Sequence, residues 1–179
     1  MTLFELPQEW VRNWIAIIIH PKGFFEKKIK SGKQSDGLIF AMVVVMIEEG
    51  SRLIIHTPWT VTYFFISLGV AVLIVTPILL HIVAAIQTLL LRMGAKNRKG
   101  IGATVQVIGY SIAPCIFAGF AIPSLRVLCA IYGSILLIIG LKEVHDVSLR
   151  RAFLISIIPA IIVFGLLFRG ILSLNSLLA

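Results

Sequence analysis

Three ionisable residues, Glu48, Glu49 and Arg52, lie inside a run that is otherwise as apolar as a membrane span. A charged side chain near the centre of a bilayer costs about 2.5–3.5 kcal/mol on insertion scales, so such residues need a partner or a function. On a helix, Arg52 lies beside both glutamates, which come three and four residues earlier. The cluster therefore predicts either a structural ion-pair network that locks a bundle or a polar cavity for a proton, an ion or a lipid headgroup.

One arginine cannot neutralise two carboxylates, so the cluster needs a second base or a protonated glutamate. Arg126 and Arg169 lie toward the same end of the predicted bundle, and either could supply the missing charge. Neighbouring helix residues project about 100° apart, so Glu48 and Glu49 cannot share one environment. We expect one glutamate to pair with arginine and the other to be protonated or to reach a polar cavity.

The composition places this cluster in a membrane. Of the 179 residues, 59% are hydrophobic and 13% are charged, whereas soluble domains carry about 25% charged residues. The mean hydropathy is +1.03. A single soluble core could not hide so much apolar surface, so we predict an all-α integral membrane protein whose first partner is the lipid bilayer.

The apolar runs predict a bundle of five transmembrane helices, because a span needs roughly 20 apolar residues. Pro77, Pro114 and Pro159 fall inside runs and predict kinks, which spans tolerate when neighbouring groups satisfy the freed carbonyls. The runs are Leu38 to His56, Thr60 to Leu91, Ile101 to Ile122, Ser124 to Leu141, and Ala152 to Leu172.

The basic residues predict the orientation. The net charge of +8 would suit a nucleic-acid partner, but the charges form short clusters between apolar runs, which is typical of cytoplasmic loops. We therefore expect no nucleic acid, a cytoplasmic N-terminus and a C-terminus outside. Except for Arg52, Arg126 and Arg169, all Lys and Arg residues precede the first span or lie in the second and fourth connections: Arg12, Lys22, Lys27, Lys28, Lys30, Lys33, Arg92, Lys96, Arg98, Lys99, Lys142, Arg150 and Arg151.

The first 36 residues predict a separate cytoplasmic or interfacial segment, followed by a transmembrane domain over residues 37–179. The stretch "LPQEWVRNWIAIIIHP" is too short and too interrupted for a span. Trp10 and Trp14 are four residues apart on one helix face, and tryptophan favours the headgroup region. We expect an interfacial helix here and a second short one in "KGFFEKKIK", with a disordered tail as the alternative.

The remaining polar residues predict packing and capping. His145, with Glu143 and Asp146, lies in a connection at the predicted cytoplasmic surface, where their spacing suits a cap or salt bridge better than a metal site. Tyr110 and Ser111 could hydrogen-bond across helices. We expect His81, a lone histidine in a span, to be a packing residue whose hydrogen bonds are satisfied. Lacking a Ser/His/Asp arrangement, phosphate loop or zinc tetrad, the sequence predicts no enzyme and no cofactor.

Four segments in register with the predicted spans resemble one family. They are "IIIHPKGFFEKK", "LLLRMGAK", "ATVQVIGYSIAPCIFAGFAIPS" and "IIGLKEVHDVSLRRAFLISIIP". Together they resemble the Yip domain family, named for proteins that interact with Ypt/Rab GTPases. The positions that carry the resemblance are Pro21, Phe24, Phe25, Gly94, Gly109, Tyr110, Pro114, Pro123, Gly140, Glu143 and His145.

The resemblance implies a five-helix bundle with a cytoplasmic N-terminus and a role in membrane organisation or vesicle traffic. The N-terminal segment is shorter than in eukaryotic relatives and similar in length to archaeal and bacterial members, for which a cell-membrane location is implied. We therefore expect an adaptor that acts through cytoplasmic loops and interfacial helices, with a membrane protein, a GTPase or a second copy of the chain as partner. The alternative is a small transporter or channel that uses the interior around Glu48, Glu49 and Arg52.

Overall fold

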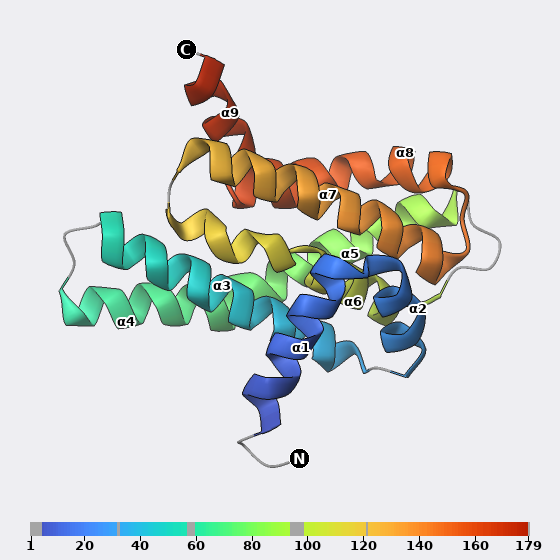
Figure 1. Cartoon of the computed structure of the whole chain (residues 1–179), viewed down its shortest axis with the longest axis horizontal. Coiled ribbons are helices and arrows are strands. Elements are labelled where there is room, and N and C mark those ends of the chain that lie inside the picture. Colours follow the sequence, from blue (N-terminus) through green and yellow to red (C-terminus); the bar gives the residue numbers. More distant parts are fainter. Residues whose placement is uncertain (1–4, 32, 57–59, 94–98, 121, 179) are drawn as a thin grey trace.

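The computed structural model describes residues 5–31, 33–56, 60–93, 99–120 and 122–178, and every regular element in them is helical (Figure 1). The α-helices are α1 (Glu5–Ile19), α2 (Pro21–Ser31), α3 (Gln34–His56), α4 (Val61–Gly69), α5 (Thr76–Arg92), α6 (Ile101–Ser111), α7 (Pro123–His145), α8 (Leu149–Ala160) and α9 (Gly170–Leu178). Two π-helical segments, η1 (Val70–Val75) and η3 (Ile161–Leu167), and one 3₁₀ segment, η2 (Ala113–Phe120), continue α4, α8 and α6.

Three continuous helices in the described residues are long and apolar enough to cross a membrane: Val61–Arg92, Pro123–His145 and Leu149–Leu167. A fourth candidate is the bent pair Ile101–Ser111 and Ala113–Phe120, whose two halves meet at 43°. The protein is therefore an all-α integral membrane protein with three candidate spans, or four if the bent pair is one span.

The predicted first span forms a helix of 23 residues, α3, but it is not among these candidates. Its length suffices, because 23 residues rise about 34 Å along a helix. Glu48, Glu49 and Arg52 make it less apolar than the other candidates. The predicted count of five is thus not established by length and composition, and it depends on whether these charges are compensated inside the protein.

The long helices run alternately along one axis of the molecule (Figure 1). α3 runs one way, α4 and α5 return, α6 and η2 run back again, and α7 and α8 follow in opposite directions. The start of α3, the end of α5, the start of α6, the end of α7 and the start of α8 therefore lie toward one end. In the sequence, the basic clusters adjoin these helix ends, while the side of the membrane on which they lie stays a prediction.

The last predicted span ends earlier than its sequence indicates. The helix continues through Pro159 as η3 and stops at Leu167, and Arg169 adopts a left-handed conformation with φ 57°. α9 then begins at Gly170 in a new direction (Figure 1). The apolar run to Leu172 concealed this break, because hydropathy alone does not show where a backbone turns.

Helices α1 and α2 are fastened to the bundle rather than standing apart from it. The indole Nε1 of Trp14 donates a hydrogen bond to the carbonyl oxygen of Ala113 at 2.9 Å, and the Tyr132 hydroxyl donates to the carbonyl oxygen of Ile18 at 2.6 Å. Trp10 stacks on Phe40 with ring centroids 5.2 Å apart. The predicted tryptophan face therefore contacts the protein, while the boundary at residue 36 stays a prediction.

Candidate polar site within the helix bundle

Glu49 and Arg52 form the ion pair that their spacing predicts. Arg52 Nε lies 2.8 Å from Glu49 Oε2, and Arg52 Nη2 donates to Glu49 Oε1. The two side chains are only 22% and 15% exposed, for Arg52 and Glu49 respectively. A bidentate ion pair of this kind fixes the orientation of both groups, so Arg52 pairs with Glu49 and not with Glu48.

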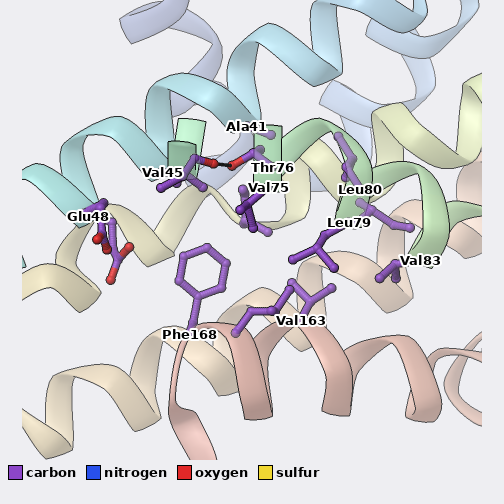
Figure 2. Close-up of a pocket in the computed structure, with 15 residues that line it drawn as sticks. Ala41, Val45, Glu48, Val75, Thr76, Leu79, Leu80, Val83, Val163 and Phe168 are labelled. Carbon is purple, nitrogen blue, oxygen red and sulfur yellow. Dashed lines mark hydrogen bonds between the residues drawn. The ribbon is translucent and has the colours of Figure 1, made fainter. Parts of the chain in front are cut away.

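Both glutamates line a cavity of about 180 Å³ between α3, η1, α5, α6 and η3, but only Glu49 has an arginine partner among the described residues. Figure 2 shows the Glu48 carboxylate at one end, with Phe168 nearby and apolar side chains such as Leu79 and Val163 along the rest. Within the described part of the chain, no residue forms a hydrogen bond or ion pair with this carboxylate. The two glutamates thus have the unequal environments that adjacent helix positions require.

Both π-helical segments line this cavity. Ala71 and Val75 come from η1, and Val163 and Leu167 come from η3. The Thr76 hydroxyl donates to the Ala71 carbonyl oxygen at 2.8 Å and adds a side-chain bond to the widened turn. Widened turns of this kind occur frequently at functional sites.

Arg126 and Arg169 do not pair directly with either glutamate, as far as the described residues show. Arg126 Nε donates to the Ala118 carbonyl oxygen at 2.8 Å. The next residue, Gly119, lies so close to the Glu48 carbonyl oxygen that a Cβ there would clash with it. Arg126 is therefore held near Glu48, and both Arg126 and Arg169 are within electrostatic reach of its carboxylate.

His145 is buried, which corrects its predicted place at the surface. It is the last residue of α7, and its Nδ1 accepts a hydrogen bond from the backbone N–H of Lys99 at 3.2 Å. Its Nε2 lies 3.4 Å from the Thr104 hydroxyl, which accepts a hydrogen bond from Thr88. His145 therefore joins α7, the start of α6, and α5.

The predicted partners of His145 are placed elsewhere. Glu143 pairs with Lys142 at 2.7 Å, and Asp146 ends α7 in a left-handed conformation. No group of three or more His, Cys, Asp or Glu side chains among the described residues could hold a metal ion.

Both ring nitrogens of His81 have hydrogen-bond partners, as its place in a span predicts. Its Nδ1 lies 2.7 Å from the Pro77 carbonyl oxygen, which can only accept a hydrogen bond, so Nδ1 carries the proton. Its Nε2 then accepts from the Gln34 side-chain amide at 2.9 Å. This contact connects the start of α3 to α5.

Tyr110 and Ser111 are buried, but in the described part of the chain neither side chain forms the predicted hydrogen bond to another helix. The Ser111 hydroxyl donates to Val107 of its own helix at 2.6 Å. Tyr110 packs against Phe24 and Phe40, each with ring centroids 4.9 Å apart from its own. The pair therefore contributes packing through an aromatic cluster.

Two of the positions that carry the family resemblance are glycines at which elements of the bundle come into close contact. A Cβ at Gly109 would clash with the Gly37 carbonyl oxygen, so α3 and α6 touch through their backbones. A Cβ at Gly140 would meet Val107 and Phe25 at 2.8 and 2.9 Å. Pro21 and Pro123 begin α2 and α7, Pro114 is buried in η2, and Gly94 lies outside the described residues.

A family model for the Yip1 domain matches residues 15–170. The chain belongs to the Yip1 domain family. The match begins in the second half of α1 and ends at the first residue of α9, so it includes α2, the cavity and every position that carries the resemblance. A search of curated proteins finds no match, and a search of solved structures finds none either.

Sequence reasoning missed three features of this Yip1-domain protein. The two π-helical segments that line the cavity consist of ordinary apolar residues, so nothing in the sequence distinguishes them from α-helix. Side-chain contacts connect Thr88 to Thr104 and Thr104 to His145, across as many as 57 residues of sequence. The spacing of these residues in the sequence cannot reveal such contacts. The attachment of α1 through Trp14 had a visible signal, because an indole N–H on a helix next to a bundle usually finds a partner.

Proposed function

We propose that this Yip1-domain protein is a membrane-organising adaptor that acts through α1, α2 and the basic connections on the cytoplasmic side. The observation that supports it best is an exposed apolar stripe on α1. Val11, Ile15 and Ile19 are 48%, 44% and 60% exposed, and their spacing of four places them along one side of the helix. The side facing the bundle holds Ile17, which is fully buried.

The stripe suits the membrane interface. At 15 residues, α1 is too short to span a bilayer, and Gln8 and Arg12 flank the stripe in a shallow groove on this side. Amphipathic helices of this kind lie in the plane of the interface with their apolar side among the acyl chains. Because Trp14 and Tyr132 anchor α1 to the bundle, a helix inserted in one leaflet would be rigidly coupled to the spans.

The proposal includes α3 as a fifth span, with the N-terminus in the cytoplasm and the C-terminus outside. Its ionisable residues have compensation inside the protein: Glu49 pairs with Arg52, and Glu48 has Arg126 and Arg169 within reach. Intramembrane charges that pair in this way are tolerated. The alternating directions of the helices in Figure 1 support the same count.

The cavity favours an adaptor over a transporter. Of its described lining residues, only Glu48, Glu49 and Thr76 have polar side chains, and the others are apolar. A route for an ion across the bilayer needs polar groups along its length. On α2, the exposed residues Lys22, Glu26 and Lys27 form the charged surface where we place the contact with a partner protein.

Reconstitution into lipid vesicles tests the membrane-organising role. The wild-type chain should narrow or tubulate vesicles as its density in the membrane rises, measured by cryo-electron microscopy. Replacing Val11, Ile15 and Ile19 together by Ser should abolish this effect. The matched control replaces Leu154, Ile158 and Ile161, which are similarly exposed on the lipid side of α8 and η3, by Ser. Equal loss in both triple variants, or unchanged vesicles with the wild type, would refute the proposal.

A further inference from the structure

The cavity beside Glu48 has the size and lining of a hydrocarbon site. A cavity of about 150 Å³ lined by Leu, Ile and Phe stays free of water and binds benzene. The present cavity measures about 180 Å³ and is walled by residues such as Leu80, Val83 and Ile108. It can therefore hold a short hydrocarbon segment.

The cavity is open to the lipid side of the protein. Val75 of η1 and Leu167 of η3 both line it, and they are 42% and 43% exposed. In a membrane protein, an exposed apolar side chain within a span faces acyl chains. A lipid chain could thus pass between η1 and η3, with one end inside the cavity and the rest in the bilayer.

Glu48 supplies the polar group that a ligand would meet. Its carboxylate lines the cavity and has no hydrogen-bond partner among the described residues. A carboxyl group in apolar surroundings without a hydrogen bond is costly, so a donor that enters the cavity gains free energy from it. The ligand must therefore carry a hydrogen-bond donor at the end of an apolar body.

The surrounding charges decide which donor fits. Glu49 and Arg52 neutralise each other, and Arg126 and Arg169 are within electrostatic reach of Glu48 without lining the cavity. The two guanidinium groups offset the attraction of Glu48 for an ammonium headgroup, and a carboxylate or phosphate in the cavity would lie directly against the Glu48 carboxylate and be repelled by it. A neutral hydroxyl group donates to Glu48 without adding a charge.

We infer that this cavity binds the hydroxyl end of a neutral lipid, whose chain leaves between η1 and η3. The inference rests on the cavity, the lateral opening and the unpaired carboxylate, and it does not depend on the proposed adaptor role. Occupancy would satisfy Glu48 and fill the space between α3 and η3. The natural ligand class is a membrane lipid with a free hydroxyl group and no net charge.

Four probes with one chain and different headgroups test this inference: dodecanol, dodecylamine, dodecanoate and dodecane. The full-length chain is purified into phosphatidylcholine nanodiscs, and the dissociation constant of each probe is obtained from the rise in melting temperature with its concentration. Dodecanol should bind at least about tenfold more tightly than the other three, which is the scale of one hydrogen bond to a carboxylate.

Two variants and one matched control locate the site. Glu48→Leu removes the acceptor at similar volume and should reduce dodecanol binding to the level of dodecane. Ala71→Leu fills the cavity and should abolish binding of every probe, whereas Ala85→Leu, at an exposed position of α5 outside the lining, should not. Tighter binding of the amine or the carboxylate would overturn the headgroup assignment. Equal effects of Ala71→Leu and Ala85→Leu would overturn the site, even if the Glu48 variant fails to fold.

Discussion

The guanidinium group of Arg52 holds the carboxylate of Glu49 through two of its nitrogen atoms, from one turn to the next of α3. Glu49→Gln therefore leaves a positive charge without its partner. Breaking a fully buried pair costs about 3–5 kcal/mol, and we expect a smaller loss here because both groups retain some exposure. Glu48→Gln should change the thermal stability in detergent far less.

The double variants identify the pair. Combining Glu49→Gln with Arg52→Gln should restore part of the lost stability, because neither partner then remains charged. The same arginine change should not rescue Glu48→Gln. Small and equal effects of the two single changes would mean that both glutamates are solvated, and α3 would then not be a span.

The backbone contact between α3 and α6 predicts different outcomes for two glycines. Gly109→Ala would place a Cβ against the Gly37 carbonyl oxygen and force the helices apart, at a cost of about 1–3 kcal/mol. Gly50→Ala, which has open space, should be neutral or stabilise by up to about 1 kcal/mol. Thermal unfolding of both variants checks the contact, and a harmless Gly109→Ala would contradict it.

His145 should hold the start of α6 in place. His145→Phe removes the acceptor for the Lys99 amide and the partner of Thr104, so we expect a loss of about 1–3 kcal/mol and faster hydrogen exchange over residues 99–104. His20→Phe, at an exposed position before α2, is the control. Unchanged exchange in the His145 variant would show that this contact does not order α6.

The pair of Glu9 and Lys28, 3.0 Å apart, should make the attachment of α1 to α2 depend on pH. The hydrogen bond from Lys28 lowers the pKa of Glu9 below its ordinary value. The contribution of this ion pair to the stability of the fold is therefore fully present near neutral pH, and it is lost as the pH falls through the lowered pKa of Glu9. Because both groups are partly exposed, we expect at most about 1 kcal/mol.

A comparison of wild type with Glu9→Gln measures this contribution. The difference in melting temperature should shrink on acidification and at high salt, which screens exposed pairs. A difference that grows as the pH falls would show that Glu9 stabilises the chain in its protonated form.

The sequence predicted the elements better than their contacts. The run Thr60 to Leu91 agrees with the helix Val61–Arg92 within one residue, because a long apolar run has few alternatives in a membrane. The spacing of Glu48, Glu49 and Arg52 required unequal roles. Which glutamate pairs with arginine depends on the rotation of α3 within the bundle, and that is set by contacts with residues far along the chain.

Other features depended on backbone geometry and tertiary packing, to which hydropathy is insensitive. The break at Arg169 interrupts a continuous apolar run. His145 looked like a surface residue because its neighbours are charged, yet it lies with Leu141 and Val144 among the buried residues of α7. Trp10 and Trp14 share a face, as predicted, but tertiary contacts with Phe40 and Ala113 determine that this face meets the protein.

The proposed position of α1 in the cytoplasmic leaflet, with its apolar stripe among acyl chains, is tested most directly by spin labels at single introduced cysteines in reconstituted vesicles. Labels at positions 11, 15 and 19 should collide with oxygen more than with a water-soluble nickel complex, as a label at Leu154 should. A label at Lys22 should collide with the nickel complex, and only when the complex has access to the cytoplasmic side. Labels at 11, 15 and 19 that behave like Lys22, or a Lys22 label reached from outside, would contradict the account.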